Sequence, residues 1–446
     1  MHEWGGGICG FPKTIGVVSV RQKDDAGDKG KLIVVGLGYV GLPMAVRAVE
    51  AGYSVVGVDT DDLRVKRLGA CDSYIEGIGD ARLAAAADSG RFRATTEYED
   101  IDGLDVCVIT VPTPLREGVP DLSFVECAGR SIAPHLTPGS TVILESTTYP
   151  GTTESLLLPL LEQGSGLSAG ADFHLGYSPE RIDPGNPDWH LENTPKVISG
   201  IDAASLRRIE GFYGDIVERT VPVSSCRTAE LTKLLENTYR HVNIALVNEM
   251  AMVSRQLGAD IWEAVEAAAT KPFGFMPFRP GPGVGGHCLP VDPSYLSWQV
   301  KRLLKRDLRF IALANEINDN MPDHVVRRVT RGLNERGKSV KDARILQLGL
   351  AYKKNTGDIR ESPALVLARS LLALGARLVV AEPHTDAYLV PLDITRVELT
   401  EAEIRSADVI VVATDHDAFD YALVERAGAY VLDTRNRCRG ERVEIL

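Results

Sequence analysis

A cysteine and a carboxylate stand four residues apart in one glycine-containing turn, Gly285-Gly286-His287-Cys288-Leu289-Pro290-Val291-Asp292. The two glycines let the backbone approach a ligand closely, and Pro290 suits the first position of a helix. The positive end of a helix dipole lowers the pKa of a nearby thiol and so favours the reactive thiolate. We therefore predict that Cys288 is a nucleophile and that Asp292 lies beside it. The alternative is a buried, inert cysteine, since free cysteines are among the most buried residues.

A long helix carries the next pair of candidates. Residues 228–257 contain no proline or glycine, and apolar residues recur at steps of three and four, which predicts a helix of about eight turns. Lys233 and Asn237 are one turn apart and share a face of this helix. An ammonium and an amide in that arrangement can stabilise a developing oxyanion. The alternative is a solvated lysine on an exposed face.

Polar residues also follow two predicted strands. Residues 105–111 and 141–145 are apolar runs typical of buried parallel strands. Ligands bind at the carboxyl ends of strands in open α/β sheets, so Thr147 is expected to reach the reacting centre. Pro112 and Thr113 are expected to line a cofactor, although turn chemistry would also explain them.

A further polar cluster, residues 177–183, contains an acid next to an arginine. Glu180 and Arg181 indicate a site there because buried charged groups are uncommon without a partner or a function.

The segment between the long helix and Cys288 is predicted to be a shaped loop. Prolines and glycines interrupt every period in residues 271–283. So many glycines next to a candidate nucleophile favour a loop that encloses a ligand. Its aromatic residues can also be read as packing groups. The residues that we assign to this ligand are Phe273, Phe275, Gly283 and Gly285.

A strand, a glycine turn and a helix open the first domain. The apolar run 31–35 precedes Gly36-Leu37-Gly38-Tyr39-Val40-Gly41, and a helical pattern continues to residue 50. Gly36 permits a tight turn, Gly38 removes a side chain where a pyrophosphate approaches, and Gly41 lets the helix pack on the strand. The helix N-terminus then faces the phosphates. The turn, including Tyr39 and Val40, is predicted to bind a dinucleotide.

An acidic residue after the next strand indicates which dinucleotide. Asp59 follows the predicted strand 53–58 and lies 21 residues beyond Gly38. A carboxylate there accepts hydrogen bonds from the ribose hydroxyls and repels a 2′-phosphate, so NAD is favoured over NADP. Arg64 nearby keeps NADP as an alternative, and the other alternative for Asp59 is a surface carboxylate.

Bulk properties limit the classes of partner. The chain has 446 residues, 44% of them hydrophobic, which indicates two or three domains. A formal charge of -12 argues against binding to nucleic acid or to an anionic membrane, and no apolar run approaches a membrane span. Seven scattered cysteines without metal-ligand spacing fit a reducing cytoplasm and predict no metal site. Small molecules are the expected partners.

A second α/β sheet is predicted near the C-terminus. Strand-like runs occur at residues 343–350, 377–381, 408–413 and 430–433. The first loop lacks a glycine fingerprint, but the cations Lys353, Lys354 and Arg360 are placed where a mononucleotide's phosphates could bind. The alternative is a set of solvated surface cations. The predicted divisions are a flexible extension (1–30), a dinucleotide domain (31–222), a central helical domain with the catalytic loop and dimer interface (223–325), and a nucleotide domain (326–446).

Together these motifs resemble the nucleotide-sugar 6-dehydrogenases, the UDP-glucose/GDP-mannose dehydrogenase family, from about residue 32 to the C-terminus. The resemblance rests on GLGYVGLP, VPTP, ESTTYPGTTE, SPERIDPGN, ELTKLLENTYRHVNIALVNE, PGPGVGGHCLPVDPSYL and LGLAYKKNTGDIRESPA, which occur in this order. It implies an α/β fold of two Rossmann-like, doubly wound parallel-sheet domains joined by a long central helix. It also implies NAD as cofactor, a UDP-sugar substrate and a homodimer formed through that helix.

The resemblance also implies residue roles. The Cys288 thiol is the nucleophile of a four-electron oxidation that takes a sugar C6 alcohol to a uronate. Lys233 and Asn237 stabilise oxyanions, Asp292 and Thr147 handle water and protons, and Glu180 supports hydrolysis. Glu180, Arg181, Lys233 and Asn237 are also expected to contact the sugar nucleotide.

The exact sugar is suggested by one residue and the loop before it. His287 and the loop before it resemble the UDP-N-acetylhexosamine branch, so UDP-N-acetylglucosamine is favoured over UDP-N-acetylmannosamine and UDP-glucose. Two rival interpretations remain. One is a two-electron hydroxyacid-type dehydrogenase, which needs no thiol, and the other is an NAD-binding scaffold without activity.

Overall fold

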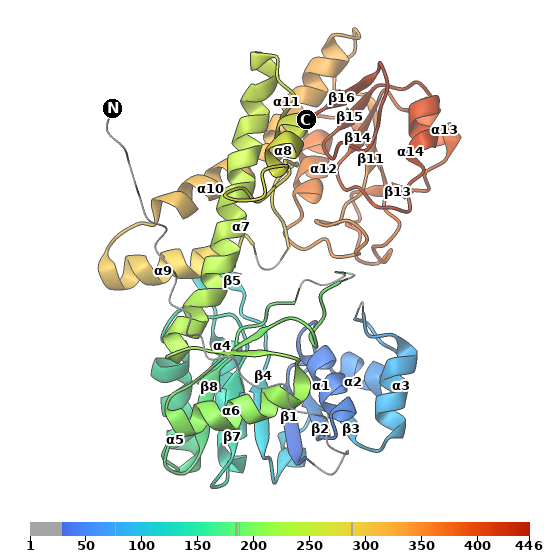
Figure 1. Ribbon diagram of the computed structural model, residues 1–446. Coiled ribbons are helices and arrows are strands. Elements are labelled where there is room, and N and C mark those ends of the chain that lie inside the picture. The colour runs from blue at the N-terminus through green and yellow to red at the C-terminus, as the bar shows by residue number, and fades with distance from the viewer. Residues whose placement is uncertain (1–28, 76, 183–185, 187, 287–288) are drawn as a thin grey trace, which may run out of the picture.

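Two α/β domains are joined by one long helix in the computed structural model (Figure 1). The structure describes residues 29–75, 77–182, 186, 188–286 and 289–446. Cys288 and His287 therefore lie outside the described residues, as does most of the predicted extension. Lys29, at the start of the described chain, forms an ion pair with Asp215 at 2.7 Å. Among the described helices, none is long and apolar enough to cross a membrane.

The first domain is built on an eight-stranded sheet in the order β10-β9-β8-β7-β4-β1-β2-β3. Runs such as KLIVV and TVIL are almost completely buried because helices cover both faces, as is usual for parallel sheets. The pair β8 and β9 is antiparallel, which the sequence did not predict. The strands are β1 (Lys31–Val35), β2 (Ser54–Val58), β3 (Phe92–Thr95), β4 (Val106–Ile109), β7 (Thr141–Leu144), β8 (His174–Tyr177), β9 (Lys196–Gly200) and β10 (Thr220–Pro222).

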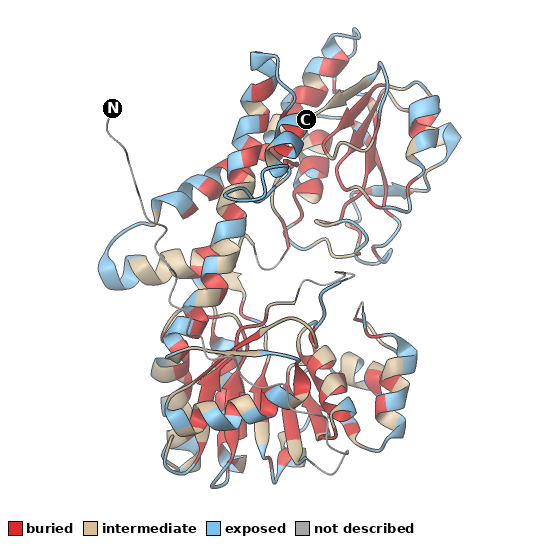
Figure 2. Ribbon diagram, viewed as in Figure 1, coloured by how far each residue is buried: buried red, intermediate tan, exposed pale blue. Residues whose placement is uncertain are grey.

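Helices pack on both faces of this sheet and create two buried apolar clusters, one on each side. Figure 2 shows most of the strands as a buried layer between partly exposed helices. A short hairpin, β5 (Leu115–Arg116) and β6 (Val119–Pro120), extends from the loop after β4. The helices are α1 (Gly41–Glu50), α2 (Asp62–Gly69), α3 (Asp80–Asp88), α4 (Ser123–Ile132), α5 (Leu158–Ser165) and α6 (Ala203–Ile216).

The central helix α7 (Cys226–Ser254) begins where the Ser225 side chain accepts a hydrogen bond from the Thr228 N–H. Its first half packs into the core of the first domain through Ala229 and Leu234. Its second half contacts α8 (Ile261–Ala269) and α10 (Arg309–Asp319), and α9 (Asp292–Leu304) packs across it. One rigid helix thus fixes how the two domains face each other.

The second domain contains a six-stranded, all-parallel sheet in the order β13-β12-β11-β14-β15-β16. The strand order reverses between β11 and β14, and in such sheets ligands bind outside the carboxyl ends at that point. The strands are β11 (Arg344–Leu348), β12 (Arg377–Ala381), β13 (Thr395–Val397), β14 (Val409–Val412), β15 (Val431–Asp433) and β16 (Val443–Ile445). The helices are α11 (Met321–Asn334), α12 (Pro363–Ala373), α13 (Glu401–Ser406) and α14 (Tyr421–Arg426).

Candidate active site

Asp292 and Asn237 meet at the junction of two helices. Asn237 on α7 donates from Nδ2 to Asp292 Oδ2 at 2.5 Å, across 55 residues of sequence. Asp292 is 3% exposed and Lys233, one turn before Asn237, is 8% exposed, so both charges are held away from solvent. The three residues that the sequence predicted as one group are therefore brought together by the crossing of α7 and α9.

Burial decides the ionisation of Asp292. The low-dielectric surroundings raise the pKa of this carboxyl to about 6, while the Lys233 ammonium and the Asn237 amide act in the opposite direction. A carboxylate with a pKa near neutrality can accept and release protons at physiological pH. Asp292 therefore has the properties of a general base.

The start of α9 differs from the prediction. The helix begins at Asp292, and the proline in its first turn is Pro293 rather than Pro290. The residue that benefits from the positive end of the helix is therefore Asp292 itself. Because Cys288 lies outside the described residues, its position relative to this helix stays a prediction.

An ion pair ties the Glu180 segment to the central helix. Arg181 donates to both oxygens of Glu236, at 3.3 and 2.7 Å, and to the Pro195 carbonyl at 2.6 Å. Glu236 directly precedes Asn237, so this fork-like contact brings the loop after β8 to the same end of α7. Glu180 is 9% exposed and points its Oε1 at the N–H of Ile182. Arg181 is thus engaged by the protein itself.

The loops after β4 and β7 reach the same region. The Tyr295 hydroxyl, on α9, donates to the Thr113 carbonyl at 2.8 Å and lies 3.3 Å from the Pro114 carbonyl. This contact holds the predicted cofactor loop with Pro112 against the helix that carries Asp292. Thr147 lies at the carboxyl end of β7, half-buried, as its position after the strand predicts.

The glycine turn after β1 has the shape that a dinucleotide requires. Gly36 has φ +92, and a Cβ at Gly41 would lie 1.8 Å from the Gly36 carbonyl oxygen, so neither position tolerates a side chain. At Gly38 nothing lies within 4 Å of the point that a Cβ would occupy, which leaves room for a pyrophosphate before α1. The backbone of Tyr39 and Val40 completes the turn. The glycine turn therefore has the shape and the space to hold the pyrophosphate of NAD.

Asp59 braces this turn. Its Oδ2 accepts a hydrogen bond from the Leu37 N–H at 2.8 Å and lies 3.4 Å from Arg64 Nη1. The Arg64 guanidinium also lies 5.8 Å from the centre of the Tyr74 ring. The carboxylate is thus placed after β2 with its second oxygen directed to the Asp61 N–H at 2.9 Å. Arg64 is engaged with Asp59, which weakens the argument that it serves a 2′-phosphate.

The loop before Cys288 is held by the central helix α7 and by the second domain. The Gly281 N–H donates to Asn248 Oδ1 at 2.9 Å, and the Gly286 N–H donates to the Arg360 carbonyl at 3.1 Å. A Cβ at Gly285 would lie 2.6 Å from the Glu361 carbonyl oxygen, and Gly283, at φ +132, would meet Pro363 at 2.9 Å. The glycines let this segment lie directly on the second domain.

Two aromatic residues of the loop, both predicted to contact the ligand, are exposed in this structure. Phe273 is 70% exposed and Phe275 is 39% exposed. Lys271 lies over the Phe273 ring, 5.0 Å from its centre.

The loop after β11 carries the predicted nucleotide cations. Lys354 pairs with Asp417 at 3.3 Å, and Arg360 pairs with Asp358 through two nitrogens. The Arg360 guanidinium also lies 5.7 Å from the centre of the Tyr39 ring, so the loops after β1 and β11 meet across the interdomain space. Lys353 lies in the same loop, half-buried.

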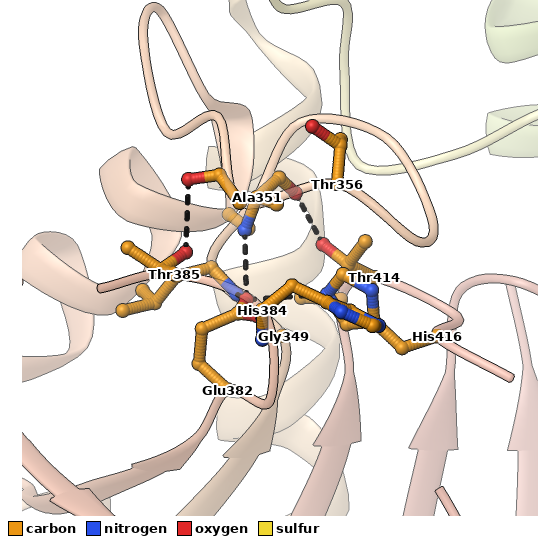
Figure 3. A network of polar contacts seen from close by, with 12 residues as sticks. Gly349, Ala351, Thr356, Glu382, His384, Thr385, Thr414 and His416 are labelled. Carbon is orange, nitrogen blue, oxygen red and sulfur yellow. Dashed lines mark hydrogen bonds and ion pairs between the residues drawn. The ribbon is translucent and has the colours of Figure 1, made fainter. Parts of the chain in front are cut away.

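A buried polar network supports this loop from below (Figure 3). Glu382 Oε2 accepts from the N–H groups of Leu350 and Ala351 at 2.7 and 3.1 Å and lies 3.2 Å from His416 Nε2. His416 Nδ1 in turn accepts from the Asn355 N–H at 2.9 Å. These side chains come from the ends of β12 and β14, which the sequence reasoning did not connect with the loop.

Sequence reasoning missed several supporting residues. The buried pairs Glu382 with His416 and Glu145 with Lys196 had one available signal, a charged residue at the edge of an apolar strand run. Tyr295 and Asn248 had no such signal, because hydroxyl and amide contacts across more than thirty residues leave no pattern in the chain.

Models of the UDP-glucose/GDP-mannose dehydrogenase family match three segments of the chain. The NAD binding domain matches residues 30–217, the central domain 227–320 and the UDP binding domain 346–440. The chain belongs to the UDP-glucose/GDP-mannose dehydrogenase family. It is an NAD-dependent nucleotide-sugar dehydrogenase, and its C-terminal domain is the UDP binding domain. The predicted family, fold class and cofactor are confirmed.

Several similar proteins carry related names. The chain is 37% identical over 413 residues to UDP-N-acetyl-D-mannosamine dehydrogenase from Pyrococcus horikoshii, covering 91% of this chain and 95% of that protein. It is 36% identical over 400 residues to UDP-N-acetyl-D-glucosamine 6-dehydrogenase from Salmonella typhi, covering 88% and 91%. The solved structure of UDP-D-ManNAc dehydrogenase from Pyrococcus horikoshii matches with a TM-score of 0.84 at 35% identity, covering 93% of this chain and 98% of that one.

Proposed function

We propose that this enzyme oxidises the C6 hydroxyl of UDP-N-acetylglucosamine to the uronic acid in two successive steps that consume two NAD+. The observation that carries this proposal is that Lys233 and Asn237 of α7 meet Asp292. Asp292 lies four residues after Cys288 in the sequence. A simple alcohol dehydrogenase has no use for a cysteine four residues before a buried base that meets two oxyanion donors.

The proposed residue roles follow from the chemistry. Bound NAD+ accepts the hydride that leaves carbon in each oxidation. The alcohol first becomes an aldehyde, and the Cys288 thiolate adds to its carbonyl carbon to give a thiohemiacetal. The resulting oxyanion is stabilised by the Lys233 ammonium and the Asn237 amide. Loss of the second hydride gives a thioester, since a thiohemiacetal, unlike an aldehyde, has a hydroxyl on the carbon to be oxidised.

Hydrolysis completes the cycle. A water molecule adds to the thioester carbon, the carbon–sulfur bond breaks, and the uronate leaves with the thiolate restored. We assign Asp292 and Thr147 to water and proton handling, and Glu180 to the removal of a proton from the attacking water. The burial of Asp292 and Glu180 supports a part for both in proton transfer, because both carboxyl groups are shielded from bulk solvent.

The cofactor and the nucleotide would bind in the space between the two sheets. Gly36, Gly38, Gly41 and Asp59 would hold NAD, with Pro112 and Thr113 along it. Lys353, Arg360, Gly283 and Gly285 would contact the sugar nucleotide. The contact between Arg360 and Tyr39 supports this arrangement, since it joins the cofactor turn to the nucleotide loop. We keep the domain limits 31–222, 223–325 and 326–446 as part of the proposal.

The proposed sugar rests on His287 and on the names of similar proteins. Relatives of comparable identity are named for N-acetylmannosamine and N-acetylglucosamine, and both carry a 2-acetamido group. UDP-N-acetylmannosamine is therefore the first alternative, and it differs at a single stereocentre. UDP-glucose is the next alternative.

We also propose a homodimer and a reducing, cytoplasmic setting. The described cysteines Cys71, Cys107, Cys127, Cys226 and Cys438 are all free thiols, which supports a reducing compartment. The dimer would form through α7, where a stripe of apolar side chains is exposed.

Counting NADH tests the reaction class. Purified enzyme is mixed with limiting UDP-sugar from a panel of UDP-N-acetylglucosamine, UDP-N-acetylmannosamine, UDP-glucose and GDP-mannose, and NADH is measured by absorbance. We expect two NADH per UDP-N-acetylglucosamine and a uronate product by mass spectrometry. Cys288→Ser is expected to bind UDP-sugar but to lose turnover, since a hydroxyl is a far weaker nucleophile. One NADH per sugar with full activity in Cys288→Ala would refute the four-electron reaction.

A further inference from the structure

A buried charge cluster lies at the carboxyl edge of the first sheet, and the reaction scheme leaves it unused. Glu145 and Lys196 are 1% and 3% exposed, and Lys196 Nζ lies 2.8 Å from Glu145 Oε1. The same ammonium lies 3.6 Å from Glu180 Oε2. The Tyr213 hydroxyl donates to Glu145 Oε1, and the Tyr213 ring centre lies 5.2 Å from Lys196 Nζ.

The sheet topology explains why these residues meet. Glu145 directly follows β7, and Glu180 lies three residues beyond β8. Lys196 is the first residue of β9, which runs antiparallel to β8 with Tyr177 opposite Ser199. Extending that register places Lys196 opposite Glu180. The antiparallel pairing of β8 and β9 therefore returns a lysine to the edge where the catalytic loops leave the strands.

The charges of the cluster favour a functional explanation. Burying a charged group costs free energy unless a partner compensates, and well-packed apolar residues would stabilise such a site equally well. The two carboxyl groups, Glu145 and Glu180, face one ammonium, that of Lys196. Glu145 is the nearer of the two, so Glu180 shares a cation that is already paired. Burial raises the pKa of the Glu145 carboxyl, while Lys196 opposes that shift. Glu180 is the member next to Arg181, which pairs with Glu236 beside Asn237 of the proposed reaction site.

We propose that Lys196 is a positioning residue for the Glu180 carboxylate during thioester hydrolysis. Glu145 and Tyr213 hold the ammonium in place, and the ammonium attracts the Glu180 carboxylate and keeps it directed at the reaction site. In the step itself, the oxygen of water bonds to the thioester carbon, Glu180 takes the proton of that water, and the electron pair of the carbon–sulfur bond leaves on Cys288. This inference rests on the proposed function and extends it to residues that do not touch the substrate.

The test separates acylation from hydrolysis. Lys196→Met removes the charge at similar volume. Rapid mixing with NAD+ and saturating UDP-sugar is expected to release a burst of two NADH per active site at the wild-type rate. The steady-state rate is then expected to fall by about tenfold or more, since loss of general-base catalysis costs about 10²–10⁴. Mass spectrometry of the quenched protein should detect the acylated enzyme.

Two further variants keep the test decisive. Lys196→Arg retains a cation and is expected to recover much of the steady-state rate. Lys196→Gln retains hydrogen-bond donors without charge, folds more readily if the methionine variant does not, and should again accumulate the adduct. Lys338→Met is the matched control, because its ammonium pairs with Asp408 in the second domain, and it should keep the wild-type rates.

The outcomes distinguish this inference from the proposed function. If wild-type enzyme forms one NADH per sugar, the four-electron reaction itself fails. If wild-type enzyme forms two NADH but Lys196→Met slows the burst and the steady state equally, or keeps full turnover, then Lys196 has only a structural role and the inference is overturned.

Discussion

At the scale of single residues, the buried carboxyl group of Asp292 is the most informative feature of the site. The sequence does not show that Asp292 is buried. The packing of α9 against α7 leaves it 3% exposed. A pKa raised from 3.8 to about 6 corresponds to a penalty of about 3 kcal/mol for ionising this group in the native state. A carboxyl group with this pKa can accept and release a proton near neutral pH.

The first prediction concerns the pH dependence of turnover. The proposed role of Asp292 requires its deprotonated form, so kcat should rise with pH through about 6 and level off above it. Asp292→Asn should lose this rise and lower kcat by about 10²–10⁴. Steady-state rates between pH 5 and pH 8 at saturating substrate measure both effects. A wild-type profile that is flat across pH 6 would contradict the assignment.

The stability of the protein should change with the opposite sign. The native state holds the Asp292 proton more tightly than the unfolded chain does, so this group's contribution to stability is full below about pH 4 and declines as pH rises through about 6. At pH 7 Asp292→Asn should therefore unfold at a denaturant concentration no lower than wild type. A large loss of stability in this variant would show that the carboxylate is structural rather than catalytic.

At the scale of elements, the loop after β11 depends on two neighbouring strands. The Glu382 carboxylate, at the end of β12, accepts hydrogen bonds from Leu350 and Ala351 in that loop. Burial alone would raise the pKa of Glu382, but His416 and the backbone N–H groups outweigh burial and lower it to about 2. The ionised carboxylate therefore stabilises the loop above about pH 4.5, and that stabilisation is lost as pH falls toward 2.

The prediction at this scale is that Glu382→Gln weakens nucleotide binding. The amide offers one acceptor where the carboxylate offers two, so a buried donor in the loop loses its partner, at a cost of about 1–3 kcal/mol. Calorimetry should then report weaker binding of UDP with unchanged binding of NAD+. Glu403→Gln is the control, since Glu403 pairs with Arg344 away from the loop. Equal losses for UDP and NAD+ would indicate a general defect of the fold instead.

At the scale of the whole molecule, one face of α7 exposes a row of apolar side chains in the part of the chain that the structure describes. Apolar side chains recur along it at helical spacing and remain 41–62% exposed: Leu231, Leu235, Tyr239, Leu246, Met250 and Val253. Monomeric proteins seldom expose apolar patches of this extent, and a second copy of the same helix would cover the stripe.

The prediction for the assembly is therefore a dimer that charges introduced on α7 disrupt. Light scattering at micromolar concentration should give twice the mass of the chain for wild type. Leu235→Glu combined with Leu246→Glu should give the mass of one chain, because both side chains are more than half exposed and lie on the stripe. Leu374→Glu, at an exposed position in the second domain, should remain dimeric. A monomeric wild type would refute the proposed interface.

Several features could be predicted from the sequence because their signals are local. Apolar runs located half of the described strands to within one or two residues, as at β12, and the uninterrupted period of three and four residues predicted α7. Only glycine fits at positions 36 and 41 of the turn after β1, so the dinucleotide turn could be predicted from the sequence. The helical spacing of Lys233 and Asn237 likewise placed them on one face.

What the tertiary structure alone decided is where distant segments meet. The start of α9 at Asp292, the antiparallel return of β9 that carries Lys196 to Glu180, and the support of the β11 loop by Glu382 and His416 all join residues far apart in sequence. Packing and burial, which no local pattern encodes, set these contacts. Residue types and spacing thus determined the class of chemistry, while the crossing of helices and the order of strands determined which charged groups are buried beside it.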